Sequence, residues 1–212
     1  MMSMRLYAIA IDEADVLFHA PPDTAVALRA IARDLFGPTG GGARGGRPSW
    51  FGRPASRPLP PDHPTDDDID TLLNGRFVRP DRLIPSWRLI ETWIAAMSWG
   101  QRHDPLDVAQ LDAIDFDLAK AGVAPSLGLR ALVSRGWNAP IGFVPGLVAG
   151  AVTGEHVDAM LAAWTPVIDE LDGAHAGLVR ERCEWFAQFA RWREAAGAQH
   201  RPSPDLVTIF GG

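Results

Sequence analysis

The stretch from residue 37 to residue 64 limits how this chain folds more than any other part of it. Seven glycines and seven prolines make up half of its 28 residues. Proline removes a backbone donor and glycine loses the most freedom on folding, so neither a helix nor a strand is expected here. Structureless loops beyond about 12 to 15 residues are usually functional, disordered or linkers. We therefore predict a single domain over residues 1–212, with a Gly/Pro/Arg-rich insertion at 37–64.

The rest of the composition is that of an ordinary folded protein. Hydrophobic residues make up 47% of the chain and charged residues 22%, which is enough apolar material for a sizeable core. The one cysteine, Cys183, cannot form an internal disulfide, which indicates a reducing compartment. The first apolar run is too short for a secretory signal, and no run approaches the roughly 18 residues of a membrane span. A cytoplasmic protein that does not contact a membrane is predicted.

Apolar spacing and capping residues indicate mostly helices. A short buried strand is predicted at Met4–Ile11, another at Ile141–Val144, and a closing strand at Asp205–Phe210. The helices are predicted to follow Pro22, Thr65, Leu83, the Asp104–Pro105 cap and Thr153, the last of them kinked by Pro166, with the longest helix over Leu178–Ala196. The fold class that follows is a helix-dominated α+β domain, with a small sheet built from the two chain ends and the 141–144 strand.

Three segments in this order resemble one protein group. They are the start MSMRLYAIAIDEAD, the run IGFVPGLVAGAVTGEHVDAMLAAW, and an aromatic-rich helix leading into DLVTIF. This arrangement resembles the YfbM-like group of uncharacterised bacterial proteins, over roughly residues 3–12 and 141–210. The resemblance implies the same fold and a small cytoplasmic bacterial protein. It supplies no catalytic motif, and the 37–64 insertion departs from the group's pattern.

Charge is distributed unevenly along the chain. The formal net charge is -6, which argues against nucleic acid binding by the whole surface. Residues 62–117 carry twelve acids and five arginines, a net of -7, whereas residues 37–64 carry a net of +3. We call residues 62–117 the acidic body. Its run Asp66–Asp68 opens a predicted helix, where negative charge complements the helix dipole, so a solvated helix start is expected.

No metal or cofactor site is predicted. The clustered aspartates lack the spacing and glycine of a calcium loop. None of the six histidines forms a pair with metal-ligand spacing. His103 beside Asp104 and His156 beside Glu155 could act as acid–base pairs if the fold supplied a partner. Cys183 falls on an apolar helix face and is expected to be a buried structural thiol.

The insertion supplies the predicted binding residues. Its glycines follow a helix and precede prolines, which does not fit a phosphate-binding loop. Its arginines and aromatics could instead contact an anionic ligand or a protein partner, and a tryptophan on a loop is typical of an interface anchor. One arginine–glycine element also fits single-stranded nucleic acid, a partner that the acidic charge of the protein disfavours. The predicted binding residues are Arg44, Arg47, Trp50, Phe51, Arg53 and Arg57.

Two functions follow from these observations. The first is a non-catalytic cytoplasmic binding protein of bacterial type, toxin-neutralising or regulatory, which engages a protein partner through the acidic body or the Arg/Trp loop. The alternative is a small enzyme with a site assembled from scattered His, Asp and Glu residues, and with the 37–64 loop as a lid over an anionic small-molecule substrate. A pocket in which His103, His156 or His175 meets a carboxylate would favour the enzyme. The absence of a catalytic signature favours the binding protein.

Overall fold

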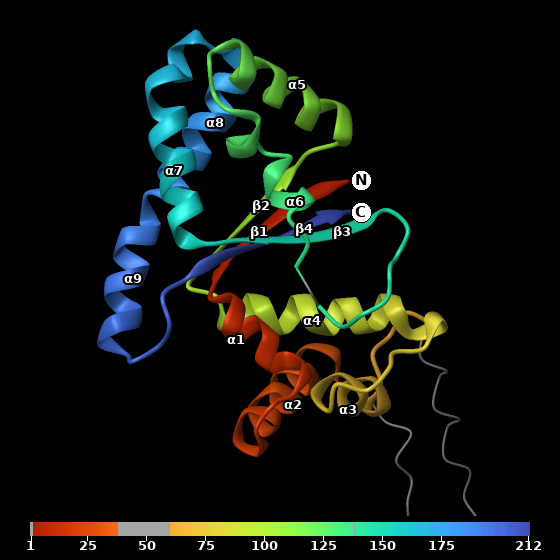
Figure 1. The fold of residues 1–212 in the computed structure, drawn as a ribbon. Coiled ribbons are helices and arrows are strands. Elements are labelled where there is room, and N and C mark those ends of the chain that lie inside the picture. The colour runs from red at the N-terminus through yellow and green to blue at the C-terminus, as the bar shows by residue number, and fades with distance from the viewer. Residues whose placement is uncertain (1, 38–59, 138) are drawn as a thin grey trace, which may run out of the picture. The chain divides into compact units, whose positions relative to one another are not determined.

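The computed structural model describes residues 2–37, 60–137 and 139–212, which form helices and one four-stranded antiparallel sheet (Figure 1). The chain divides into two compact units. The first unit comprises residues 1–15, 97–139 and 144–212, and the second comprises residues 16–96 and 140–143. The helix-dominated α+β class is thus confirmed, while the single domain with an insertion stays a prediction.

The sheet belongs to the first unit, and the two chain ends form its centre. Its order is β2-β1-β4-β3, and β1 pairs with β4 from Ser3 opposite Gly211 to Ile9 opposite Asp205. Both central strands are almost entirely buried, as their aliphatic composition requires. The prediction that the chain ends build the sheet is confirmed. The strand bounds are Ser3–Ile9 (β1), Gly100–Pro105 (β2), Leu147–Val152 (β3) and Asp205–Gly211 (β4).

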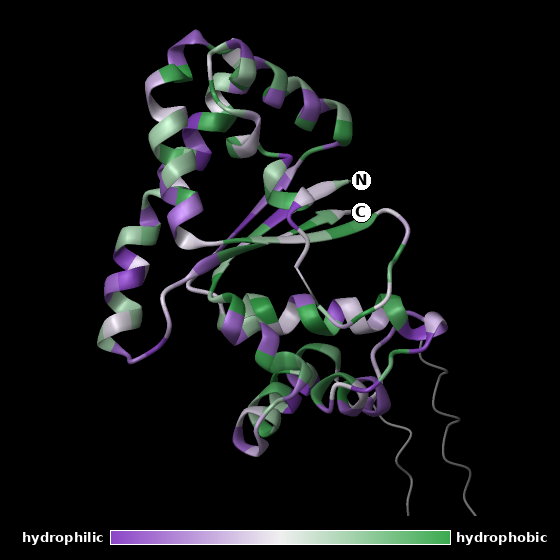
Figure 2. Ribbon diagram, viewed as in Figure 1, coloured by the Kyte–Doolittle hydropathy of each residue, from purple (hydrophilic) through white to green (hydrophobic). Residues whose placement is uncertain are grey.

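The two outer strands lie where the sequence did not predict them. Residues 141–144 form no strand; Val144 makes only an isolated bridge with Leu147, and the strand begins after the turn at Gly146, whose φ is 80°. The predicted cap Asp104–Pro105 is wrong as well, because both residues lie in β2. The helix that follows starts at Val108 and is capped by Asp107, which accepts a hydrogen bond from the Gln110 amide. Figure 2 shows why β2 was missed, since it is the hydrophilic strand of the sheet.

Helices α5 to α8 lie over one face of the sheet, and their apolar sides share a core with it (Figure 1). Met4, Leu6 and Ala8 alternate along β1 into this core, where Trp164 and Phe186 also pack. Trp185 and Trp192 pack against the core's edge. The helices of this unit are Ile11–Asp15 (α1), Val108–Lys120 (α5), Ala131–Ser134 (α6), Gly154–Trp164 (α7), Gly173–Phe186 (α8) and Gln188–Ala198 (α9).

Two of the predicted helices are interrupted. Thr153 caps α7 as expected, and the chain changes to a tighter 3-10 helix over Thr165–Glu170, where Pro166 removes an internal hydrogen bond. The longest helix predicted over Leu178–Ala196 is divided at Ala187 into α8 and α9. Cys183 is buried on α8, as expected, and burial raises the pKa of its thiol.

The second unit is helical. Its helices are Pro22–Phe36 (α2), Asp66–Leu73 (α3) and Leu83–Met97 (α4). Trp93 is fully buried and donates from Nε1 to the carbonyl of Leu28, at 2.8 Å, which ties α4 to α2. The helix after Thr65 ends at Asn74 and Gly75, as the sequence predicted. Among the described residues, none of the helices combines the length and the apolar character that a membrane span requires.

Candidate functional site

The predicted binding residues cannot be placed. Arg44, Arg47, Trp50, Phe51, Arg53 and Arg57 all fall within 38–59, outside the residues that the structure describes. Their role therefore stays a prediction. Other candidate sites must come from residues 2–37, 60–137 and 139–212, within which no group of three metal-binding side chains is present.

Three acids of α3, Asp66, Asp68 and Asp70, each lie beside an arginine of the same unit. Arg82 donates to both oxygens of Asp68, at 2.9 and 2.5 Å, and Arg29 donates to Asp70 at 2.7 Å. Burial acts to raise the pKa of Asp68, but the hydrogen bonds from Arg82 and Thr65 outweigh it and hold that pKa below its ordinary value. Asp68 is buried in a capping box with Thr65, so the expectation of a wholly solvated helix start is wrong at this residue.

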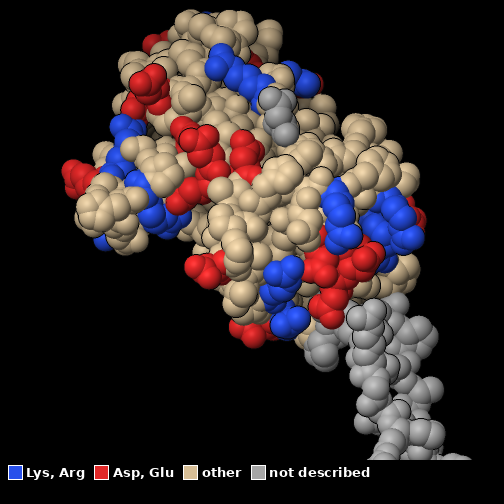
Figure 3. Space-filling view, turned by 60° about the horizontal axis from the view of Figure 1, so that its bottom comes forward, with Lys and Arg blue, Asp and Glu red and all other residues tan. Residues whose placement is uncertain are grey.

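This pairing weakens the acidic body as an electrostatic surface. On the right-hand side of the face in Figure 3, red side chains have blue ones directly beside them, and a further red group lies near the middle of the view. Arg33 lies 4.0 Å from Asp66, and Arg88 lies 2.7 Å from Asp62. Acids that are paired in this way create a weaker field than the count of charges suggests.

The acids of α5 are engaged in the same way within the first unit. Asp112 accepts from the guanidinium of Arg130. Asp115 accepts from the amides of Leu129 and Arg130, at 2.6 and 2.8 Å. Burial raises the pKa of Asp115, and these two amides offset only part of the effect. Asp115 thus holds the start of α6 to α5.

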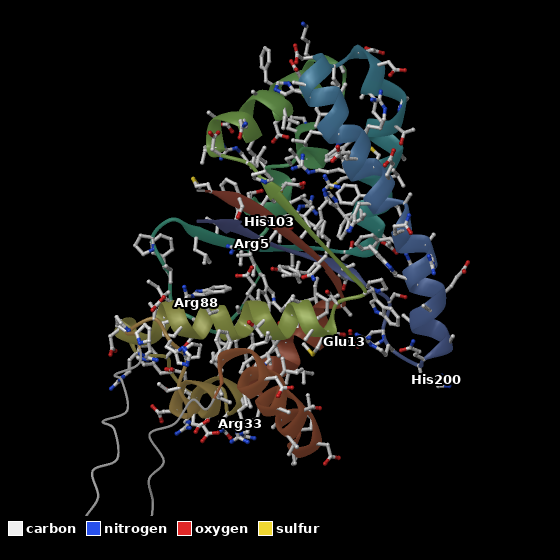
Figure 4. The ribbon with its side chains drawn as sticks, turned by 180° about the vertical axis from the view of Figure 1, so that it is seen from behind. Arg5, Glu13, Arg33, Arg88, His103 and His200 are labelled. Carbon is white, nitrogen blue, oxygen red and sulfur yellow. The ribbon has the colours of Figure 1, made fainter. Side chains whose placement is uncertain are left out.

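Of the candidate histidines, one meets a carboxylate. His175 Nδ1 lies 2.6 Å from Asp117 Oδ2, and this contact holds the pKa of Asp117 below its ordinary value. His103 is exposed on β2 opposite Arg5 of β1, as Figure 4 shows. His156 lies in the first turn of α7, where burial lowers the pKa of its ring. The sequence did not reveal the His175–Asp117 pair because its members are 58 positions apart.

A chain of four charged side chains joins β2 to α8, and the sequence analysis missed it. Glu181 accepts from Arg102 at 2.7 Å, Arg102 donates to Asp104 at 2.8 Å, and Arg182 donates from Nε to Asp104 at 3.1 Å. Arg182 is 0% exposed, and its Nη1 has no hydrogen-bond partner among the described residues. Burial lowers the pKa of Arg182, against the attraction of Asp104. The pattern GQRHDP could have indicated a strand with charged residues facing inward at positions 102 and 104.

The first unit also carries an apolar pocket of about 320 Å³, between the start of α5, α6 and the sheet. This volume is at the lower end of the range of ligand pockets, about 300 to 1,000 Å³. Val108 and Val148 stand on its walls and are each 43% exposed. Of the described residues, Arg130 and Ser134 provide its polar lining, and the rest of the lining consists of Met2, Val108, Leu111, Val133, Gly146, Val148 and Phe210.

A second pocket, of about 330 Å³, lies further along α5. Arg130 lines both pockets, so they adjoin. The walls of the second pocket include Phe116, which is 69% exposed, together with Ala119, Val123, Ala124 and Pro125. Gly128 permits the close approach of this turn to α5, because a Cβ there would lie 2.7 Å from an Asp115 oxygen.

Comparison of the chain with family models, curated proteins and solved structures found no match. The resemblance to the YfbM-like group therefore stays a prediction. The candidate sites therefore rest on their own geometry. On the first unit, the two adjoining pockets form a concave apolar surface.

Proposed function

We propose that the chain is a non-catalytic binding protein of bacterial type that engages a protein partner in the cytoplasm, in a toxin-neutralising or regulatory role. One observation carries the proposal. Phe116 is 69% exposed on the wall of an apolar pocket that adjoins a second one. Exposed aromatics beside concave apolar surface are typical of protein interaction sites, where buried aromatic anchors supply most of the binding energy. The resemblance to the YfbM-like group supports the bacterial and cytoplasmic parts of the proposal.

The second unit adds two exposed aromatics. Phe77 is 81% exposed and Phe143 is 78% exposed. The engagement of α3 and α5 acids by arginines and amides shifts the proposal from the charged side chains of the acidic body to its exposed aromatics, Phe77 and Phe116, and to Phe143. A partner held by apolar contacts should stay bound at moderate salt, because screening weakens only exposed charge pairs.

Photo-crosslinking tests this proposal. Benzoylphenylalanine replaces Phe77, Phe116 or Phe143, which keeps an aromatic ring at each position, and exposed Glu170 serves as the control position. In a lysate of the source cells we expect a discrete protein adduct from at least one phenylalanine position and none from position 170. Adducts that are the same at all four positions, or no adduct at all, would contradict a protein partner.

The alternative function is a small enzyme, and the His175–Asp117 pair favours it. A carboxylate that orients a histidine is the arrangement of a general base. Both side chains are partly exposed, at 26% and 21%, so a substrate could reach the ring. Neither residue lines the two pockets described above, which is why the binding protein is preferred.

Hydrolysis of nitrophenyl esters of increasing chain length separates these two functions. A general base contributes typically 10² to 10⁴-fold, so the enzyme requires a loss of about that size in His175→Gln. We expect instead that the hydrolysis rate of His175→Gln differs from that of the wild type by less than about threefold. His103→Gln, at an exposed position, is the control and should show the same small difference. A selective loss in His175→Gln would overturn the proposal in favour of the enzyme.

A further inference from the structure

The two pockets form one groove along α5. On α5 the first pocket is lined by Val108 and Leu111, and the second by Asp112, Asp115, Phe116, Leu118 and Ala119. These two sets are centred about seven residues apart, and at 1.5 Å per residue the pockets lie roughly 10 Å apart along the helix. Both belong to the first unit, so the groove does not depend on how the two units are placed.

A neutral ridge separates the two pockets. It consists of Arg130 and Asp112, which bind one another and are about half exposed. Asp115, which also lines the second pocket, has its carboxylate occupied by two backbone amides. The groove is therefore apolar at both ends and carries a balanced ion pair in the middle.

We propose that this groove, defined as the two pockets and the Arg130–Asp112 ridge, docks an amphipathic helix of a partner protein. The inference rests on the proposed function and names the surface and the chemistry of the partner. A helix with apolar anchors at i and i+7 spaces them by about 10.5 Å, which matches the separation of the pockets. Because the ridge is neutral, the residue that crosses it is uncharged.

The walls of the groove favour a helix over an extended peptide. An extended segment needs a strand edge to pair its amides, and unpaired buried amides are costly. Strands β3 and β4 line the first pocket, but the second pocket is lined by α5 and by residues 123–130, and none of the described strands contributes to it. An extended segment would therefore have no strand edge to pair with along the second pocket. A helix satisfies its own backbone hydrogen bonds and presents only side chains.

The size of the groove determines the affinity expected for the partner helix. Two pockets of about 320 and 330 Å³ accept one large side chain each, so the interface is at the small end of specific complexes. An affinity in the roughly micromolar range follows, with apolar contacts supplying most of it. Binding should change little between low and moderate salt, because the ridge carries no net charge.

Two hydrocarbon-stapled helical peptides of equal composition are the probes. Both contain leucines in an uncharged Ala/Gln background; one places them at i and i+7, and the other distributes them around the helix. We expect the first peptide to bind the full chain at least tenfold more tightly by fluorescence polarisation. A third peptide, unstapled and with a central proline, tests the extended form and should bind at least tenfold more weakly than the first.

Variants of the protein locate the binding surface. Ala119→Trp fills the second pocket and Val148→Trp fills the first, both at exposed positions that tolerate a larger side chain. Each variant should weaken the binding of the first peptide at least tenfold. Ala113→Trp is the matched control, since Ala113 is exposed on the same helix and lines neither pocket, and it should stay within about twofold of the wild type.

The outcomes separate this inference from the proposed function. Equal binding of the first two peptides, binding of the proline peptide, no binding by any peptide, or insensitivity to Ala119→Trp and Val148→Trp overturns the groove as a helix site. A discrete adduct from benzoylphenylalanine at Phe77 or Phe143 would in that case still support a protein partner. If none of the phenylalanine positions gives an adduct, the proposal of a protein partner is contradicted as well.

Discussion

Replacing Asp104 with alanine is expected to destabilise the protein by about 3–5 kcal/mol, because the change leaves the Arg182 guanidinium buried without its carboxylate. Asp104 is 4% exposed and accepts from Nε of Arg182 at 3.1 Å, while Nη2 lies 3.0 Å from the same oxygen. Arg102 keeps a second partner, Glu181, so most of the cost falls on Arg182. Urea unfolding followed by fluorescence measures the loss as a lower midpoint with an unchanged slope.

An apolar double variant isolates the cause. Asp104→Leu with Arg182→Met removes both charges and keeps similar volume, which is often neutral or stabilising at a buried ion pair. We expect this variant to recover to within about 1 kcal/mol of the wild type, whereas Arg182→Met alone should cost less than Asp104→Ala, since Asp104 keeps its hydrogen bond from Arg102. If Asp104→Ala and the double variant lose the same free energy of unfolding, the loss comes from packing and not from the unpaired charge.

A surface pair gives the matched comparison. Asp169 accepts from Arg180 at 3.0 Å, but Asp169 is 94% exposed. Exposed ion pairs typically contribute about 0–1 kcal/mol, so Asp169→Ala should cost less than about 0.5 kcal/mol. The two pairs have nearly the same donor–acceptor distance, so the difference between them measures the effect of burial.

The same ion pair explains how far the fold could be predicted from the sequence. β1 and β4 were predicted because their buried positions are aliphatic, and α7 was predicted because Thr153 stands before a helical stripe. β2 was missed because its inward-facing side chains, Arg102 and Asp104, are charged. They become compatible with a core only through Arg182, 78 positions away from Asp104. Hydrophobic periodicity carries no information about such long-range compensation.

The candidate groove could not be predicted from the sequence, for a related reason. Val108, Leu111 and Phe116 read as ordinary helix residues, and the pockets exist only because residues 123–134 and the sheet approach α5. The charge count, in contrast, was correct but misleading. The structure binds Asp112 to Arg130 and Asp68 to Arg82, so an excess of acids along the chain does not become an acidic patch.

The second large effect is expected for Gly150→Ala in β3, at the place where α6 meets the sheet. A Cβ at this position would lie 2.1 Å from the carbonyl oxygen of Leu132 and 3.0 Å from that of Arg135. Both neighbours are backbone atoms, and the amide of Ala151 donates to Arg135 at 2.9 Å, so the two segments cannot separate without losing hydrogen bonds. We expect a loss of about 2–3 kcal/mol, toward the upper end of the range for overpacking.

Gly136 supplies a control from the same bridge. It pairs with Gly150 across an isolated antiparallel bridge, yet a Cβ on Gly136 would meet no atom within 4 Å. Gly136→Ala should therefore be neutral, or stabilising by about 0.4–1 kcal/mol through the reduced entropy of the unfolded chain. Chemical denaturation of the two variants side by side makes the comparison, and equal effects would mean that the contact between α6 and β3 is not rigid.

The comparison also bears on the groove, because α6 supplies one wall of its first pocket through Val133 and Ser134. Gly150→Ala must push Leu132 and its helix away from β3, whereas Gly136→Ala leaves them in place. Affinity for the helical peptide with leucines at i and i+7 should accordingly fall at least fivefold in folded Gly150→Ala protein and stay unchanged in Gly136→Ala. A destabilised Gly150→Ala protein with undiminished peptide affinity would show that the peptide does not use the α6 wall. The second pocket, which α6 does not line, would then be the sole anchor to examine.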